Sequence, residues 1–333
     1  AVAPEYQFRY AHTLMAAGNY VKADNLMNEL TGENWDHEEF ASELDTMVPH
    51  KFKYDQIMNN QSSSDFGIGF YGDRIAFAST RNQERPIYPW NKLPALDLYS
   101  AEMDDEGEMT DIVLFSDAIN TDEHESSATF SQDGMVMFFD RTNEDRVKNE
   151  NDVKVAHISL YRAENVDGEW TNVEKLPFSS EDYSVEHPSL SADGSKLYFA
   201  SDMPGGSGSF DIYVVDVNED GTYGAPQNLG PGVNTAQRDQ FPFISDEDVL
   251  YFTSDGHQGF GNLDIYRTEG DFSEVENLGA SINSGNDDFA FVIKESEEMG
   301  YFASNRRGTD NLYQFTREEN EIIEAPTVTD ETS

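Results

Sequence analysis

Residues 197–213 read LYFASDMPGGSGSFDIY: a short apolar strand pattern around Phe199, a glycine-rich loop, and a second strand pattern that ends in Tyr213. Both halves of this stretch recur. The first half recurs around Phe77, Phe138, Phe199, Phe252 and Phe302, at separations of 61, 61, 53 and 50 residues. The second half ends at Tyr99, Tyr161, Tyr213, Tyr266 and Tyr313, at separations of 62, 52, 53 and 47 residues. Two landmarks that share one period indicate five copies of one structural unit.

Each copy predicts four strands. Short polar segments such as 132–134 (QDG) precede the Phe strand and are typical of two-residue hairpin turns. Turns such as 219–221 (EDG) follow the Tyr strand and lead to a fourth segment such as 227–229 (QNL). A small sheet of this kind buries both faces only by stacking on its neighbours. The sequence therefore predicts a mainly β fold, a five-bladed β-propeller of four-stranded antiparallel blades, at about 64–121, 122–184, 185–236, 237–285 and 286–320.

A third recurrence bears on how the ring closes. The segments 119–121 (INT), 233–235 (VNT) and 282–284 (INS) each follow a predicted fourth strand, and 58–60 (MNN) stands in the same relation to the first blade. This favours residues 51–57 as the outer strand of the last blade, which leaves no open edge. Residues 321–324 are the alternative for that strand. The propeller then covers 50–320, and 321–333 reads as an acidic C-terminal linker.

Residues 1–49 predict a small helical segment. Tyr6 and Tyr10 lie at helical spacing, and a second helix follows Gly18. The stretch 18–23 (GNYVKA) resembles the turn of a tetratricopeptide repeat, in which the Tyr and Ala pack between the two helices. Asp36, with Glu39 three residues later, predicts the capped start of a third helix.

Composition limits the possible functions. The net charge is −44 and acidic residues occur in every region, so the surface repels nucleic-acid backbones. We expect the acidity to serve solubility. The chain has no cysteine, which excludes disulfides, thiolate metal sites and a cysteine nucleophile. No stretch approaches the roughly 18 apolar residues of a membrane span, so we predict no membrane insertion.

Several quoted stretches together resemble a known family. They are the helical hairpin, the entry SSDFG at 63–67 leading into FYGDRIAFAS at 70–79, and the blade stretches HPSLSADG at 187–194 and GGSGSFDIY at 205–213. In this order they resemble the N-terminal part of the PorE type of OmpA-family protein, from the type IX secretion and gliding apparatus of the Bacteroidota. The blade motif is similar to the TolB and WD40 types and is typical of many periplasmic propellers.

The resemblance implies a function and a location. Its members are periplasmic, associate with the outer membrane, and act as scaffolds for other protein components of a secretion or gliding complex. They bind peptidoglycan through a C-terminal domain, which does not fall within these 333 residues. The resemblance therefore implies a non-catalytic scaffold or protein-interaction module that would be tethered to the cell wall by domains outside this chain.

The alternative from another class is a glycan-active hydrolase, because five-bladed propellers include glycosidases that use paired carboxylates. Asp97, Asp211 and Asp264 recur at one position beside the Tyr strand. We expect them to hold turns by hydrogen bonds, and we assign no catalytic residue. A propeller that binds a glycan or peptide without turning it over is a further alternative. The stretch 256–261 (GHQGFG) lies between two strands, so we predict a flexible loop there and no phosphate site.

One turn resembles the beginning of a calcium loop. Asp216, Asn218 and Asp220 alternate and are followed by Gly221, but Gln227 stands where a bidentate Glu is expected. Calcium at this turn is therefore a weak candidate, and no other cofactor is predicted.

The inserted loops 81–90 and 300–310 depart from the repeat and concentrate Arg, Tyr and Trp, which dominate protein interfaces. The predicted partner-binding residues are Arg81, Arg85, Tyr88, Trp90, Arg306 and Arg307.

Overall fold

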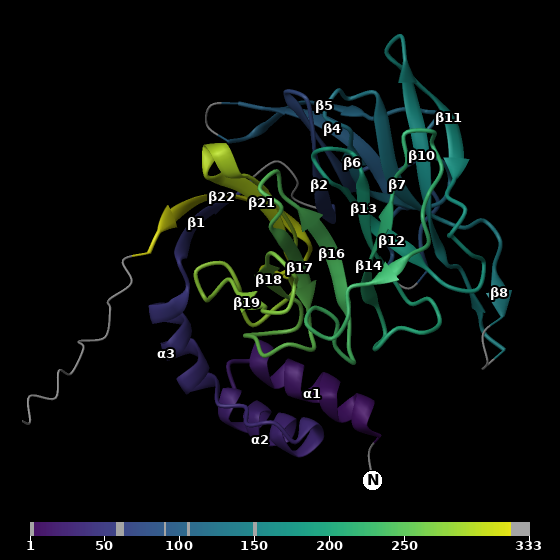
Figure 1. Cartoon of the computed structure of the whole chain (residues 1–333). Helices are drawn as coiled ribbons and strands as arrows, with labels where there is room; N and C mark the ends of the chain where they lie inside the picture. Colours follow the sequence, from purple (N-terminus) through teal and green to yellow (C-terminus); the bar gives the residue numbers. More distant parts are fainter. Residues whose placement is uncertain (1–2, 58–62, 90, 105–106, 149–151, 321–333) are drawn as a thin grey trace, which may run out of the picture.

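The computed structural model describes residues 3–57, 63–89, 91–104, 107–148 and 152–320, which form three helices followed by a five-bladed propeller (Figure 1). Each blade is a four-stranded antiparallel sheet, as the repeat predicted. The first strands of successive blades contact one another around the centre of the ring. The five repeated Phe side chains are almost fully buried. In four blades the repeated Phe lies opposite the repeated Tyr, but in blade 2 the residue opposite Tyr161 is Phe139, one position after the predicted Phe138.

The strands of the first three blades have the following bounds. Blade 1 contains β2 (Asp65–Tyr71), β3 (Arg74–Ser79), β4 (Asp97–Met103) and β5 (Met109–Leu114). Blade 2 contains β6 (Glu125–Phe130), β7 (Val136–Thr142), β10 (Ile158–Val166) and β11 (Glu169–Lys175), with a hairpin of β8 (Val147–Lys148) and β9 (Lys154–Val155) inserted before β10. Blade 3 contains β12 (Val185–Leu190), β13 (Lys196–Ser201), β14 (Asp211–Asp216) and β15 (Gln227–Asn228).

The last two blades complete the ring. Blade 4 contains β16 (Asp239–Ile244), β17 (Leu250–Ser254), β18 (Asp264–Thr268) and β19 (Glu276–Asn277). Blade 5 contains β20 (Asp288–Lys294), a 3-10 turn η1 (Glu295–Glu297), β21 (Met299–Ser304), β22 (Asn311–Glu319) and, from the N-terminal side, β1 (His50–Gln56).

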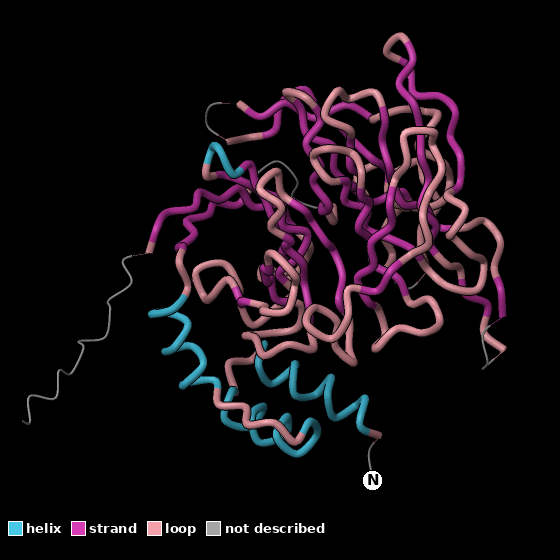
Figure 2. Tube along the Cα trace, in the orientation of Figure 1, coloured by secondary structure: helices cyan, strands magenta, loops and turns pink. Residues whose placement is uncertain are grey.

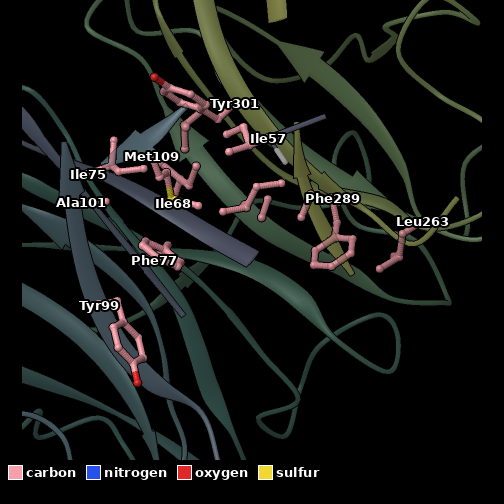
Figure 3. Close-up of a cluster of buried hydrophobic side chains, with 14 residues drawn as sticks. Ile57, Ile68, Ile75, Phe77, Tyr99, Ala101, Met109, Leu263, Phe289 and Tyr301 are labelled. Carbon is pink, nitrogen blue, oxygen red and sulfur yellow. The ribbon is translucent and has the colours of Figure 1, made fainter. Parts of the chain in front are cut away.

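The two ends of the propeller meet in blade 5. β1 pairs antiparallel with β22, so the favoured segment 51–57 lies in the last blade, while 58–60 and 321–324 are outside the described residues. A hydrophobic cluster spans this seam, with Ile75 and Phe77 of blade 1 in one core with Phe289 and Tyr301 of blade 5 (Figure 3). The ring is therefore held closed by apolar packing as well as by strand pairing.

The hairpin that opens each blade differs from the prediction in all but one case. Only β2 and β3 are joined by a two-residue turn, with Tyr71 opposite Arg74. In blades 2 and 3 the turn is longer. The backbone N–H groups of Ser131 and Ser191 each donate to the carbonyl oxygen five residues later in the chain. The hydroxyls of the same two serines donate to the Asp side chain within the turn. The Asp-Gly sequence thus closes a wider turn with a glycine at positive φ.

The recurrent Asn forms hydrogen bonds to the backbone of the Tyr strand in three blades. Asn234 accepts a hydrogen bond from the backbone N–H of Ile212 (2.7 Å) and donates one to its carbonyl (3.0 Å). Asn120 and Asn283 bind their own Tyr strands in the same two-pronged way. Since the fourth strands are short, this side chain replaces strand pairing that the backbone would otherwise lack.

The N-terminal segment forms α1 (Pro4–Ala16), α2 (Tyr20–Thr31) and α3 (His37–Met47), and Asp36 caps α3 by accepting from the backbone N–H of Glu39 (3.0 Å). Ala23 is buried between α1 and α2, but Tyr20 stacks on His37 of α3, at 3.6 Å between ring centres. No helix of the described residues is long and apolar enough to cross a membrane.

The helices are docked on blade 4, beside β18 and β19 (Figure 2). Phe260 is buried against His37 and Phe40, with ring centres 5.2 and 5.7 Å apart, and the ring Nδ1 of His12 lies 2.5 Å from the carbonyl oxygen of Gly261. The prediction of a flexible loop at 256–261 is therefore wrong. The loop is fixed because its backbone amides bind the buried Asp264 and its side chains anchor the helices.

Candidate functional site

The centre of the propeller is lined by the first strand of every blade. At the second position of these strands stand residues that line one opening of the channel, which we call the mouth: Phe66, Ser126, Glu186, Gln240 and Phe289. Deeper in the channel, strand residues such as Phe70, Phe130 and Phe243 form a narrower apolar waist of about 150 Å³. The mouth is therefore the polar end of the channel.

Every one of these inner strands carries a β-bulge just inside the mouth. Gly67 has a positive φ there, and so do His187 (φ 54°), Phe241 (φ 50°) and Ala290 (φ 52°). A non-glycine residue in this region is strained, and such residues cluster where a binding or catalytic site needs a particular geometry. The repetition of this strain around the channel points to the mouth as the functional site.

One wall of the mouth is apolar. Phe241 packs against Phe289 and Phe66, with ring centres 5.0 and 6.4 Å apart, and stacks on His187 at 3.6 Å. The inserted loops of blades 1 and 2 raise the rim, where Tyr88 lies over the ring of His124 (4.4 Å). The resulting recess has a volume of about 630 Å³, enough for a substantial part of a ligand.

The opposite wall is built from buried carboxyl groups of blades 2 and 3. Asp140 accepts hydrogen bonds at Oδ1 from the backbone amides of Ser126 and Ser127, and at Oδ2 from the backbone N–H of His187 (2.9 Å). Burial raises its pKa to about 6. This carboxyl therefore joins the two blades.

Glu186 is the second carboxyl of this wall and is 5% exposed. Its Oε1 accepts a hydrogen bond from Nε2 of Gln240 (2.6 Å). Burial raises the pKa of Glu186 to about 8, and the nearby charge of Asp140 contributes to the increase. Burial also lowers the pKa of His187 to about 3, so at neutral pH the wall consists of a protonated Glu186, an uncharged imidazole and the carboxylate of Asp140, which accepts hydrogen bonds from backbone amides.

A second recess adjoins the mouth where α1 faces the propeller. It has a volume of about 850 Å³ and is lined by α1 residues such as Phe8 and His12 and by Asp255 of blade 4. Arg238 and Asp287 line both recesses. The mouth and this recess are therefore adjacent, and we call the two together the α1 groove.

Arg81 and Arg306, two of the predicted partner-binding residues, have the same structural position in blades 1 and 5. The guanidinium of Arg81 lies 2.6 Å from Oδ2 of the buried Asp65, and that of Arg306 pairs with the buried Asp288. Each also lies over the landmark Phe of its own blade. Both side chains therefore stabilise the fold, since removing either leaves a buried carboxylate without its cation.

The other predicted partner-binding residues differ in their placement. Arg85 pairs with the buried Asp97, Nε to Oδ1 at 2.8 Å, and Arg307 donates to Oε1 of Gln56 at 2.7 Å. Tyr88 lies at the rim of the mouth. Trp90 lies outside the described residues. The structure does not gather these residues into one patch, and their role in partner binding stays a prediction.

The recurring Asp residues hold loops, as predicted. Asp211 accepts from the backbone amides of Ser207 and Gly208, and Asp264 binds the amides of 260 and 261 in the same way. Asp97 instead accepts from the side chains of Asn82 and Arg85. Both oxygens of Asp97 and Asp211 accept structural hydrogen bonds, whereas Asp264 accepts both of its bonds at Oδ2 and its Oδ1 has no partner among the described residues.

The calcium candidates also serve their own hairpin. Asp220 accepts from the backbone N–H and the hydroxyl of Thr222, and these bonds lower its pKa. Asn218 also donates to that hydroxyl (2.9 Å), while Asp216 pairs with Lys196 (3.0 Å). Within the described residues no cluster of three or more metal-ligating side chains occurs.

The sequence analysis missed Asp140, Glu186 and His187. One signal was available: where blade 2 has Asp140, the other blades have the small residues Ala78, Ala200, Thr253 and Ala303 at the equivalent position. A carboxyl in place of a repeated small residue marks a departure from the repeat.

Fold and site together define a five-bladed propeller with N-terminal helices and a ligand-sized groove on one face. Among solved structures the chain is similar to a putative TolB from Agrobacterium tumefaciens, with a TM-score of 0.43, 17% identity, and coverage of 77% of this chain and 78% of the other. It is also similar to TolB from Acinetobacter baumannii, with a TM-score of 0.42, 12% identity, and coverage of 91% and 69%.

A thermostable family-43 glycoside hydrolase gives a TM-score of 0.47, with 10% identity and coverage of 79% and 92%. No family model and no curated protein matches the chain.

Proposed function

We propose that this chain is a non-catalytic protein-interaction module that acts in the periplasm, and that it holds a segment of a partner protein in the mouth of the channel. The partner would be another component of an outer-membrane-associated secretion or gliding assembly. The family resemblance of the blade and helix motifs supports this setting. Attachment to peptidoglycan would come from domains outside these residues.

The observation that carries the proposal is the state of the carboxyl groups in the mouth. Both oxygens of Asp140 accept hydrogen bonds from blades 2 and 3, so this group is occupied by the fold. Acid–base catalysis needs a carboxyl that is free to reach its substrate. A recess with one apolar wall, one polar wall and a raised rim is suited instead to holding a ligand.

Cross-linking from a defined position tests the proposal. A photoreactive amino acid is placed at Ala156, which lines the mouth, and in a control variant at Val166, which is exposed at the far end of the β10–β11 hairpin. We expect a discrete covalent complex with an outer-membrane protein from Ala156 and none from Val166. Equal labelling from both positions, or none from either, contradicts the proposal.

A glycan-active hydrolase is the second candidate, because Glu186 has the raised pKa of a general acid and Asp140 is close enough to influence it. An assay for new reducing ends on a panel of bacterial polysaccharides separates the two. Release that is abolished by Glu186→Gln would replace the binding proposal by a catalytic one.

A further inference from the structure

Among the described residues, two carboxylates of the α1 groove have no ion-pair partner. Asp287 accepts from the side-chain amide of Asn305 (2.6 Å) and from the backbone N–H of Leu263 (3.3 Å), and Asp310 accepts from the hydroxyl of Ser64 (2.5 Å), so all these donors are neutral. The ion pairs of the same face involve other carboxylates, Asp255 with Arg238 and Asp288 with Arg306. Asp287 and Asp310 thus carry negative charge that their own contacts do not neutralise.

Both groups line the mouth. Burial raises the pKa of Asp310, and the charge of Asp287 raises it further. Asp287 also contributes to the raised pKa of Asp264 below it. A positive charge placed between Asp287 and Asp310 would relieve this repulsion, whereas an anionic ligand would increase it.

Two histidines that line the groove are themselves buried, and each has a buried ring nitrogen without a hydrogen-bond partner among the described residues. His12 is 4% exposed and His187 is 8% exposed, and both line the groove. The Nε2 of His12 and the Nδ1 of His187 have no hydrogen-bond partner among the described residues. Burial lowers the pKa of both rings, so they add no positive charge to the groove at neutral pH.

Resting on the proposed function, we infer that the α1 groove binds an extended, basic segment of the partner protein, with a lysine or arginine side chain between Asp287 and Asp310 and an apolar residue against Phe241. The two recesses of the groove adjoin between α1 and the channel mouth, because Arg238 and Asp287 line both. A chain in extended form follows such a shape, and its cation complements the uncompensated carboxylates.

The probe for this inference is a fluorescein-labelled peptide of about ten residues of alternating lysine and alanine, which spans about 30 Å when extended. Its anisotropy is measured with the whole chain at near-physiological salt. Asp287→Asn combined with Asp310→Asn should weaken binding about tenfold. The matched control, Glu43→Gln with Glu219→Gln, removes two charges from exposed sites away from the groove and should change binding less than about twofold. An equal loss in both double variants would mean that the peptide senses only the net charge, and would overturn the inference.

Two further readouts keep the test decisive. A photoreactive group on the same peptide maps its position on the wild-type protein, so the inference does not depend on the folding of the variants; attachment to residues outside the groove overturns it.

The Ala156 cross-link is then repeated in the Asp287→Asn, Asp310→Asn protein. Loss of the partner supports the inference. If the partner is still captured, the basic-segment inference fails while the proposed function stands. If even wild type captures no partner, the proposed function fails and the peptide experiments alone decide the inference.

Discussion

Because of Glu186 in the mouth, we expect the stability of the protein to depend on pH in an unusual way. The substitution Glu186→Gln isolates the contribution of this one side chain. Glu186 has a pKa of about 8 in the folded protein against 4.5 for an ordinary Glu side chain. The folded state therefore binds this proton more tightly than the unfolded state does. Its contribution favours folding most below pH 4.5 and is lost as the pH rises toward 8.

The size of the effect follows from proton linkage. With these two pKa values, the free energy of unfolding is lower than it would be with a permanently protonated Glu186, by about 1 kcal/mol at pH 5 and about 3 kcal/mol at pH 7. Gln does not titrate, and its side-chain oxygen can still accept the hydrogen bond from Gln240. Between pH 5 and pH 7 the variant should therefore gain about 2 kcal/mol of stability relative to wild type.

Urea denaturation at several pH values between 5 and 8 measures this difference directly. Comparing the variant with wild type at each pH cancels the buried carboxyls that the two proteins share. Glu219→Gln, at an exposed turn, is the control and should run parallel to wild type throughout. If the Glu186→Gln and wild-type curves are also parallel, Glu186 is ionised in the folded protein and the description of it as a protonated group of the mouth is wrong.

Three further substitutions test the contacts that hold the fold. Asn234→Ala leaves the backbone N–H and carbonyl of Ile212 unpaired and should cost about 2–4 kcal/mol, measured by denaturant unfolding. Arg306→Ala removes the cation of buried Asp288 and should cost about 3–5 kcal/mol, whereas a purely partner-binding role would leave the melting temperature unchanged. Phe260→Ala empties the contact between the loop and the helices, so limited proteolysis should release residues 1–49 while the propeller stays resistant; an unchanged cleavage pattern would show that other contacts suffice.

The fold could be predicted from the sequence because the residues that repeat along the chain are core residues. Phe199 and Tyr213 recur since each blade needs the same aromatic pair at the same depth, and their spacing gave the number of blades. The hairpin turns were harder, because the hydroxyl of Ser131 widens a turn that the Asp-Gly pair alone would make tight.

The site was harder to predict, because it depends on contacts between blades. Asp140 and His187 are far apart in the sequence, and only the ring brings the carboxyl to the backbone amide. Arg306 appeared suited to a protein interface, since nothing in the sequence pairs it with Asp288. The raised pKa of Glu186 likewise arises from burial, which no local pattern encodes.

The departures from the repeat are concentrated where blades 2 and 3 meet. Blades 1 and 5 place Phe66 and Phe289 at the mouth, but blade 3 places Glu186 at the equivalent position. Next to it, blade 2 has Asp140 where the other blades have Ala78, Ala200, Thr253 and Ala303. A propeller that needed only to close its ring would gain stability from apolar residues at both positions, because buried carboxyls are costly. The asymmetry therefore gives the mouth a polar side and an apolar side, and a ligand held there has one preferred orientation.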